Sequence, residues 1–266
     1  MIKINGIALE QKQFPDGTLH FEVPEPQEDW KVLEITWLYD NDVELFMLQC
    51  IVDKYPNFDK VLILPYVPHA RMDRTKHFTD VFTLKSFCKI INTMNFRSVC
   101  VLDPHSDVTP ALLDRVFVLP ADSWVPQVIE HEEFGDDFVF FYPDAGAAKR
   151  YDSGKPHTYG VKKRNWETGK IESLVIADPD VVKGKNVIIV DDICSYGGTF
   201  SRAAAALKEA GAEKIYLFVS HCEGNIFKGT VFSDGNIDAV YTTNSLIKPW
   251  EVPEGMEGKF YIVDMF

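Results

Sequence analysis

Short hydrophobic segments alternate with amphipathic ones along most of the chain, a pattern that predicts strands alternating with helices. Strands are expected over residues 2–9, 18–23, 31–38, 61–64, 98–102, 138–142, 158–161, 187–190, 214–220, 239–242 and 259–263. Helices are expected over residues 42–55, 82–94 and 201–210. This order is typical of βαβ units, so we expect an α/β protein with doubly wound, mainly parallel sheets. The length suits two domains, and we place them at 1–128 and 129–266, because acidic residues and Pro126 lie together at 122–137.

The most informative segment follows the apolar residues 187–190 and begins with two adjacent carboxylates, Asp191 and Asp192. A short loop then leads into the alanine-rich helix, and its residues are Ser195, Tyr196, Gly197, Gly198 and Thr199. Glycines let backbone N–H groups close on an anion, hydroxyls add donors, and a helix N-terminus favours negative charge. The loop therefore predicts a phosphate site, and the carboxylates suit sugar hydroxyls or hydrated magnesium beside it. The alternative is a strand-to-helix turn with acidic capping and no ligand.

Composition and charge narrow the class of protein. The chain is 46% hydrophobic, as globular proteins are, and no apolar run approaches the ~20 residues that span a bilayer. The net charge of −13 argues against non-specific binding of nucleic acid. The five cysteines show no Cys-x-x-Cys spacing, so there is no zinc signature, and the first residues contain no signal-peptide core. We expect a cytoplasmic protein that binds neither membrane nor nucleic acid.

Two loops in the first half carry residues that can bind anions or a metal ion. Arg71 and Arg74 follow a predicted strand, and their guanidinium groups can bind phosphate oxygens or stack on a base. The alternative is a solvated salt bridge within the loop. Asp103 and His105 follow the next strand and could hold magnesium or orient phosphate. A histidine in such a position is also compatible with a purely structural role.

The second half carries two comparable groups. Asp144 precedes a predicted helix start and is a possible magnesium ligand, although it could equally be the N-cap of that helix. The segment Lys162-Lys163-Arg164 is the one tight basic run in an acidic chain. Such cations can stabilise the charge that develops on a transferring phosphoryl group, and the alternative is a solvated basic face.

The joint order of these segments resembles the PRPP synthetase family, the ribose-phosphate diphosphokinases. The segments are Phe14-Pro15-Asp16-Gly17, the loop from Pro65 to Arg74, Asp103-Pro104-His105, Pro143-Asp144, Lys162-Lys163-Arg164 and the loop after Asp191. The resemblance covers nearly the whole chain. Type I phosphoribosyltransferases share only the last of these segments, so the early ones distinguish the two classes.

The resemblance implies two phosphoribosyltransferase-like domains and an active site between them. It implies transfer of the diphosphoryl group of ATP to the 1-hydroxyl of ribose 5-phosphate, a step of nucleotide biosynthesis that requires Mg²⁺. ATP would contact Arg71 and Met72, together with Asp16, Gly17 and Thr18 from a neighbouring subunit of a homo-oligomer, a dimer or a hexamer.

The resemblance also assigns the remaining site residues. His105 and Asp144 would serve the magnesium ion, and Lys162 and Arg164 would be catalytic residues on a mobile loop. The residues implied in binding ribose 5-phosphate are Arg164, Asp191, Asp192, Ser195, Tyr196, Gly197, Gly198 and Thr199.

Several positions depart from the family pattern. Thr18 stands where the family commonly has Glu, Met72 where it has Gln, and Ser195-Tyr196 where it has an Asp-Thr pair. The usual first helix is missing, and the chain is shorter than typical members. These departures concern nucleotide preference and regulation more than the reaction. Two other functions remain open, a phosphoribosyltransferase that consumes PRPP and a non-catalytic regulatory subunit.

Overall fold

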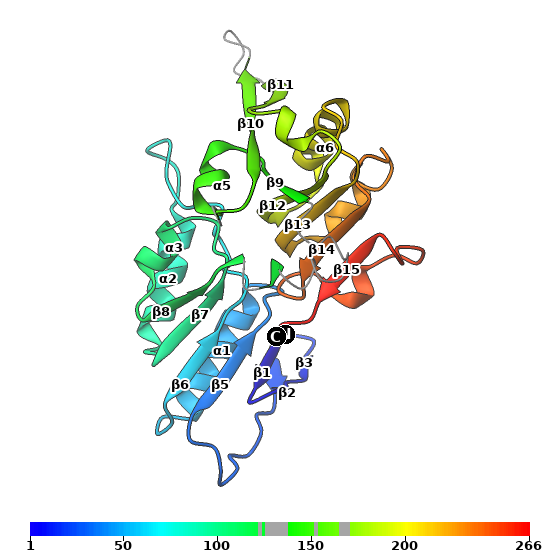
Figure 1. The fold of residues 1–266 in the computed structure, drawn as a ribbon. Coiled ribbons are helices and arrows are strands. Elements are labelled where there is room, and N and C mark those ends of the chain that lie inside the picture. Colours follow the sequence, from blue (N-terminus) through cyan, green and yellow to red (C-terminus); the bar gives the residue numbers. More distant parts are fainter. Residues whose placement is uncertain (122–123, 126–137, 152–153, 165–170) are drawn as a thin grey trace. The chain divides into compact units, whose positions relative to one another are not determined.

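The computed structural model describes residues 1–121, 124–125, 138–151, 154–164 and 171–266; for 162–164 and 171–173 only the backbone is described. The chain divides into two compact units, Met1–Pro120 with Phe266, and Ala121–Met265 (Figure 1). We call them unit 1 and unit 2. The domain boundary expected at 128 lies outside the described residues. No helix in the described part of the chain is both long and apolar enough to cross a bilayer.

Unit 1 is built on a mostly parallel sheet with the strand order β2-β1-β5-β6-β7-β8. Its strands are β1 (Ile2–Ile4), β2 (Ile7–Ala8), β5 (Leu33–Trp37), β6 (Lys60–Ile63), β7 (Ser98–Leu102) and β8 (Val116–Leu119). Its helices are α1 (Val43–Lys54), α2 (Thr83–Thr93) and α3 (Val108–Leu112). From β5 to β8 the strands are parallel and follow one another in sequence, whereas β1 pairs antiparallel with both β2 and β5. Polar loops therefore follow successive strands on the same edge of the sheet.

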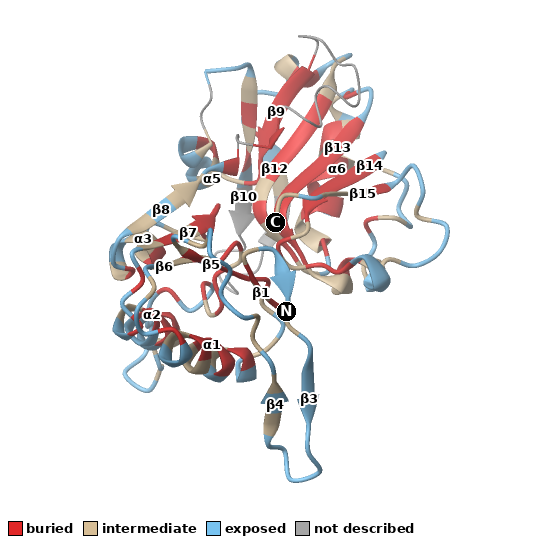
Figure 2. Cartoon of the chain, turned by 90° about the horizontal axis from the view of Figure 1, so that it is seen from below, coloured by how far each residue is buried: buried red, intermediate tan, exposed pale blue. Residues whose placement is uncertain are grey.

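The N-terminal segment forms two hairpins rather than the single strand expected over residues 2–9. Asn5 and Gly6 both have positive φ, 46° and 81°, which turns the chain back between β1 and β2. The second hairpin pairs β3 (Gln11–Gln13) with β4 (Leu19–Phe21) around the expected Pro-Asp-Gly turn. Figure 2 shows this second hairpin extending away from its own unit, largely exposed.

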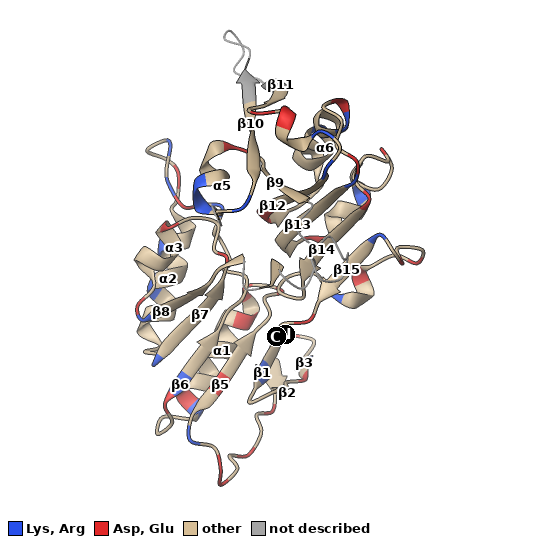
Figure 3. Cartoon of the chain, viewed as in Figure 1, with Lys and Arg blue, Asp and Glu red and all other residues tan. Residues whose placement is uncertain are grey.

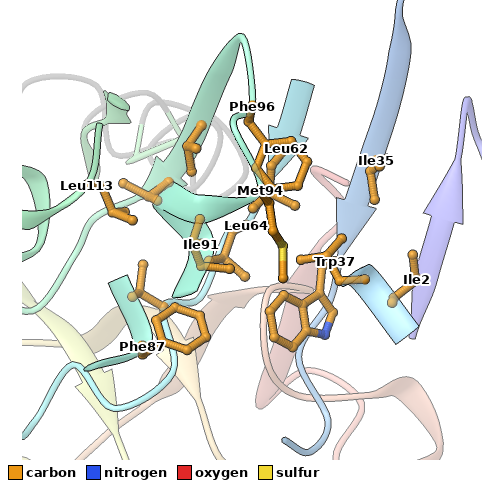
Figure 4. Close-up of a cluster of buried hydrophobic side chains, with 14 of the residues drawn as sticks. Ile2, Ile35, Trp37, Leu62, Leu64, Phe87, Ile91, Met94, Phe96 and Leu113 are labelled. Carbon is orange, nitrogen blue, oxygen red and sulfur yellow. The ribbon is translucent and has the colours of Figure 1, made fainter. Parts of the chain in front are cut away.

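The core of unit 1 lies between its sheet and helices α1 and α2. Trp37 and Ile35 of β5, Leu62 of β6 and Phe87 and Ile91 of α2 are almost fully buried and belong to one cluster (Figure 4). The helix residues recur at i and i+4, which places them on one face of α2. Burial of these side chains, at about 25 cal/mol per Å² of apolar surface, fixes the strand ends from which the polar loops leave.

Unit 2 contains a seven-stranded sheet with the order β11-β10-β9-β12-β13-β14-β15. Its strands are β9 (Phe138–Tyr142), β10 (His157–Arg164), β11 (Ile171–Ile176), β12 (Asn186–Cys194), β13 (Ile215–Cys222), β14 (Ala239–Thr243) and β15 (Phe260–Val263). Its helices are α5 (Ala145–Arg150) and α6 (Gly198–Glu209), with 3₁₀ turns η2 (Asp180–Val182), η3 (Gly224–Lys228) and η4 (Pro249–Glu251). Only β10 and β11 pair antiparallel in this sheet.

The strand order of unit 2 reverses at β9. The chain moves from β9 to β10 on one side and then returns to β12 on the other, so a switch point lies between β9 and β12. In open α/β sheets, ligands bind beyond the carboxyl ends of the strands at such a point. All residues of β9, β13 and β14 are buried, as expected of central parallel strands (Figure 2).

Some elements differ from those expected from the sequence. Strand β10 continues through Arg164 because it pairs with β11, a strand that the sequence analysis did not predict. Strand β12 runs on to Cys194, so Asp191 and Asp192 lie within it rather than after it. The cause is again pairing, since Ile193 and Cys194 remain in register with β13. Strand β8 and helix α3 were also not predicted, and α6 begins at Gly198 rather than at Ser201.

Candidate active site

The carboxylates of unit 2 lie at the switch point. Strands β9 and β12 are parallel neighbours, and Asp144 lies two residues after the first of them while Asp191 lies near the end of the second. Acidic residues mark the end of β12 and basic residues the end of α5 (Figure 3). The Asp144 carboxylate caps α5, accepting from the backbone N–H groups of Gly146 and Ala147, both at 3.1 Å. The N-cap alternative of the sequence analysis is therefore confirmed.

Mutual repulsion and burial govern the charge of this acidic group. Burial raises the pKa of Asp191 well above its ordinary value, and the negative charges of Asp192 and Asp144 raise it further. Asp192 is itself 6% exposed, and its backbone N–H donates to the Asp191 carboxylate at 3.0 Å. An acidic cluster of this kind is stabilised by a ligand that supplies hydrogen-bond donors or positive charge.

The loop Ser195–Gly197 joins β12 to α6 in a tight turn. Gly197 is the N-cap of the helix and has φ 75°, a left-handed conformation that glycine adopts without cost. Helix α6 is 12 residues long, so its first N–H groups and its dipole face the loop. Tyr196 is 56% exposed above this turn, whereas Gly197 is buried. The expected phosphate-binding geometry, a glycine turn at a helix N-terminus after a buried strand, is present.

A carboxylate that the sequence analysis did not single out lies against this loop. Ser195 Oγ donates to Glu223 Oε2 at 2.5 Å, and the backbone N–H of Glu223 donates to the carbonyl of Cys194. Glu223 directly follows β13, whose last residue Cys222 is in register with Cys194. The contact depends on this strand pairing, and no local sequence signal would have identified it.

In unit 1 the loops after β6 and β7 bring the predicted residues together. Asp73 is buried, and its two carboxylate oxygens accept from Arg74 Nε at 2.7 Å and Arg74 Nη2 at 3.0 Å. Arg74 holds the pKa of Asp73 below its ordinary value, and the nearby His105 imidazole contributes in the same direction. The salt-bridge alternative is confirmed for Arg74, whereas Arg71 and Met72 are exposed on the same loop.

The hairpin residues expected to contact a nucleotide form an exposed turn with an internal hydrogen bond. Asp16 Oδ1 accepts from the backbone N–H of Thr18 at 2.9 Å, and this bond lowers the pKa of Asp16. Gly17 has φ 87°, which the turn requires. Phe14 beside them is 55% exposed, so the tip presents an apolar ring and a carboxylate to solvent.

Comparison with known proteins identifies the family. Residues 147–237 match the model of the phosphoribosyl transferase domain. The ribose-phosphate pyrophosphokinase of Gloeobacter violaceus is 30% identical over 257 residues, which are 91% of this chain and 75% of that protein. The chain belongs to the ribose-phosphate pyrophosphokinase family. The corresponding enzyme of Thermococcus kodakarensis is 29% identical over 241 residues, covering 88% of this chain and 81% of its own.

A solved structure supports the same family at the level of the fold. The phosphoribosylpyrophosphate synthetase of Mycobacterium smegmatis superposes with a TM-score of 0.75 at 20% identity, covering 97% of this chain and 86% of that chain. The two-unit α/β architecture is therefore that of a ribose-phosphate pyrophosphokinase, as the sequence predicted.

The predicted site residues of this family member fall into groups within each unit. Unit 2 brings together Asp144, Asp191 and the loop before α6, and unit 1 brings together the loops that hold Asp73 and His105. Lys162 and Arg164 lie in β10, and their side chains are outside the described residues. Within the described part of the chain, no three His, Cys, Asp or Glu side chains are close enough to hold a metal ion by themselves.

Proposed function

We propose that the protein is a ribose-phosphate diphosphokinase that transfers the β,γ-diphosphoryl group of ATP to the 1-hydroxyl of ribose 5-phosphate, giving PRPP and AMP. The hydroxyl oxygen attacks the β-phosphorus and loses its proton to solvent, the bond from that phosphorus to the α–β bridging oxygen breaks, and AMP leaves with the electron pair. The observation that carries the proposal is the left-handed Gly197 at the start of α6 beside Asp191, in a chain of this family.

Unit 2 supplies the acceptor site in this proposal. The N–H groups of Gly197, Gly198 and Thr199 bind the 5-phosphate, with Ser195 and Tyr196 completing the loop. Asp191 accepts hydrogen bonds from the ribose hydroxyls, with Asp192 beside it. Sugar hydroxyls are suitable ligands because they donate to carboxylates without adding a further negative charge to the acidic group.

Unit 1 supplies the donor site. Arg71 and Met72 contact the nucleotide, and both are exposed on the loop that also carries the Asp73–Arg74 ion pair. Asp16, Gly17 and Thr18 contact the adenine of ATP bound by a neighbouring copy. A hairpin as small and exposed as β3–β4 is marginally stable alone, which supports a partner that covers it.

Charge compensation completes the mechanism. Lys162 and Arg164 stabilise the charge that develops at the transferring β-phosphorus, since positioning and electrostatics supply most of the catalysis in phosphoryl transfer. Mg²⁺ neutralises the triphosphate when it is bound. His105 and Asp144 would hold it, and the neighbouring carboxylates Asp191 and Asp192 add negative charge that favours a cation. All five cysteines are free thiols, which suits the reducing conditions of the cytoplasm.

Phosphorus NMR of the purified protein with ATP, Mg²⁺ and ribose 5-phosphate tests the proposal. PRPP and AMP should accumulate in equal amounts, with no inorganic diphosphate. If the protein instead consumes PRPP when a base is added, it is a phosphoribosyltransferase, and binding without turnover would indicate a regulatory subunit. The Arg71 loop argues against the first alternative because it lies outside residues 147–237, which match the phosphoribosyl transferase domain.

A shared donor site requires a homo-oligomer, either a dimer or a hexamer. Specific activity should therefore fall as the protein is diluted below the dissociation constant of the assembly. Full activity of a species that light scattering shows to be monomeric would contradict the assignment of Asp16 to a neighbour's site.

A further inference from the structure

The acceptor loop of unit 2 is supported along its length by one segment, residues 223–231, which follows β13. At the start of the loop, Ser195 Oγ donates to Glu223 Oε2 at 2.5 Å. Beyond the loop, the hydroxyls of Ser201 and Thr230 are hydrogen-bonded at 2.9 Å. We call residues 223–231 the supporting segment.

The middle of the loop is held by close packing rather than by hydrogen bonds. A Cβ placed on Gly229 would lie 1.9 Å from the carbonyl oxygen of Tyr196, so only glycine permits this approach of the two backbones. Gly229 has φ −89° and ψ −163°, values open to any residue, so it is the space and not the conformation that requires glycine. A Cβ on Gly197 would likewise lie 2.2 Å from the buried Val231 side chain.

The Ser195–Glu223 contact also decides how Ser195 acts. A hydroxyl has one hydrogen to donate, and here that hydrogen is directed to a carboxylate. The Glu223 carboxylate accepts from Asn225 Nδ2 as well, at 3.2 Å, which holds it toward the loop. Hydrogen bonds to a charged partner are stronger than neutral ones, so this contact fixes the first residue of the loop.

We propose that Glu223 and Gly229 are positioning residues for the acceptor, setting the phosphate-binding loop through Ser195 and Tyr196 without touching the ligand. The proposal rests on the proposed function for its substrate, ribose 5-phosphate. The loop N–H groups then point at the phosphate before it arrives, so the ordering of the loop does not weaken binding. Ser195 acts through its backbone and its bond to Glu223, not as a hydroxyl donor to phosphate.

Steady-state kinetics of matched variants test the proposal. Gly229→Ala should raise the KM for ribose 5-phosphate at least tenfold, and Glu223→Ala and Ser195→Ala about three- to tenfold, with kcat and the KM for ATP within about threefold of wild type. Glu223→Gln should restore a KM close to wild type, because its amide oxygen still accepts from Ser195. Ser233→Ala, which removes an exposed hydroxyl bonded only locally to Thr230, is the matched control.

A second measurement does not depend on the reaction. Inorganic phosphate should raise the Tm of the wild type by binding the loop, and should raise it less in Gly229→Ala and Glu223→Ala. If no PRPP forms but this difference between variants holds, the proposed function is wrong and the positioning role stands. If PRPP forms and Glu223→Ala and Gly229→Ala keep the wild-type KM, or if Glu223→Gln is as impaired as Glu223→Ala, the positioning role is wrong.

Discussion

Each unit holds a carboxylate with a strongly shifted environment, Asp73 on the loop after β6 and Asp191 within β12, but the two are compensated in opposite ways. In unit 1, Asp73 is buried against Arg74, which lowers its pKa. In unit 2, the pKa of Asp191 is raised by burial, and further by Asp192 and Asp144. The first carboxylate is already compensated by an arginine of the protein. The second has only acidic neighbours among these groups, so it is the one suited to a ligand that supplies hydrogen-bond donors or positive charge.

The connections from strand to helix also differ between the two units, in their length. Unit 2 joins β12 to α6 through Ser195–Gly197, and the helix N-terminus comes directly beside the strand end. Unit 1 joins β6 to α2 through residues 64–82, a much longer loop. A short connection provides backbone N–H groups for an anion. A long one provides side chains, here the exposed Arg71 and Met72, which suit a larger and more variable ligand such as a nucleotide.

The largest effect is expected where unit 2 acts on the transition state. Lys162→Ala and Arg164→Ala should each lower kcat by about 100- to 1000-fold, or roughly 3–4 kcal/mol, with the KM for ATP almost unchanged. Arg71→Ala in unit 1 should instead raise the KM for ATP about tenfold and leave kcat nearly intact. Lys214→Ala, at an exposed lysine before β13, is the control. Wild-type turnover in both the Lys162 and Arg164 variants would show that the basic run is a solvated face without a catalytic role.

A smaller loss is expected from the acceptor carboxylate. Asp191→Asn should lower kcat/KM for ribose 5-phosphate about 30- to 100-fold, because hydrogen bonds to a charged acceptor contribute roughly 2–3 kcal/mol. The KM for ATP should stay within about twofold. Steady-state kinetics with each substrate varied separately make the comparison, and the exposed Asp180→Asn serves as control. Unchanged affinity and turnover with ribose 5-phosphate would remove Asp191 from the site.

Much of the fold was predictable because local patterns and tertiary structure agree in it. Alternating apolar segments predicted most of the parallel strands, and the Pro-Asp-Gly turn predicted the β3–β4 hairpin. Two of the missed features depend on strand pairing rather than on a local pattern. Strand β11 forms by pairing with β10, its neighbour in the chain, and β12 extends to Cys194 because it stays in register with β13. The Asn5-Gly6 turn was the exception, since its sequence signal was available.

The local geometry of the candidate site was predictable to a similar extent. The glycine loop and the acid pair are contiguous in sequence, so their pattern carried the prediction. Glu223 was missed because it lies 28 residues from Ser195, and only the pairing of β12 with β13 brings it to the loop. Neither a propensity nor a motif encodes such a contact.

The carboxylates of Asp73 and Asp191 should make the stability of the protein depend on pH in opposite ways. The pKa of Asp73 is lower in the folded protein than in the unfolded chain, where it is 3.8. Asp73 therefore stabilises the fold above pH 3.8, and this stabilisation is lost as pH falls through the folded pKa. The pKa of Asp191 is higher in the folded protein. Its contribution to stability is therefore present below pH 3.8 and is lost as pH rises through the folded pKa. At neutral pH, with a chelator and no ligand, Asp191→Asn should therefore raise Tm and Asp73→Asn should lower it.

The shifts should be on the order of 2–4 °C each. Both differences in Tm from wild type should become smaller as the pH is lowered. The difference for Asp191→Asn should decrease first, because Asp191 has the higher folded pKa. Scanning calorimetry from pH 7 to pH 3 makes the measurement. A less stable Asp191→Asn at pH 7 would show that hydrogen bonds to the charged carboxylate outweigh its burial and its acidic neighbours.

The smallest effect concerns which nucleotide unit 1 accepts. Thr18 is exposed on the hairpin tip and Met72 is 39% exposed on its loop, so both can be replaced with little cost in stability. A glutamate at position 18 could accept from the exocyclic amine of adenine, whereas a threonine hydroxyl both donates and accepts. A thioether at position 72 likewise lacks the amide that pairs with a base edge. We therefore expect ATP to be the best donor, with weaker discrimination against GTP than strict hydrogen bonding would give.

Thr18→Glu combined with Met72→Gln should raise the ratio of kcat/KM for ATP to that for GTP by about five- to tenfold, roughly 1 kcal/mol. Because both substitutions lie in unit 1, the KM for ribose 5-phosphate should not change, which separates the donor site from the acceptor site. Lys12→Gln, on the exposed strand β3 of the same hairpin, is the control for altered hairpin charge. A wild type already strict for ATP and unaffected by the double substitution would show that adenine is recognised elsewhere, and backbone groups around Arg71 would then be the next candidates.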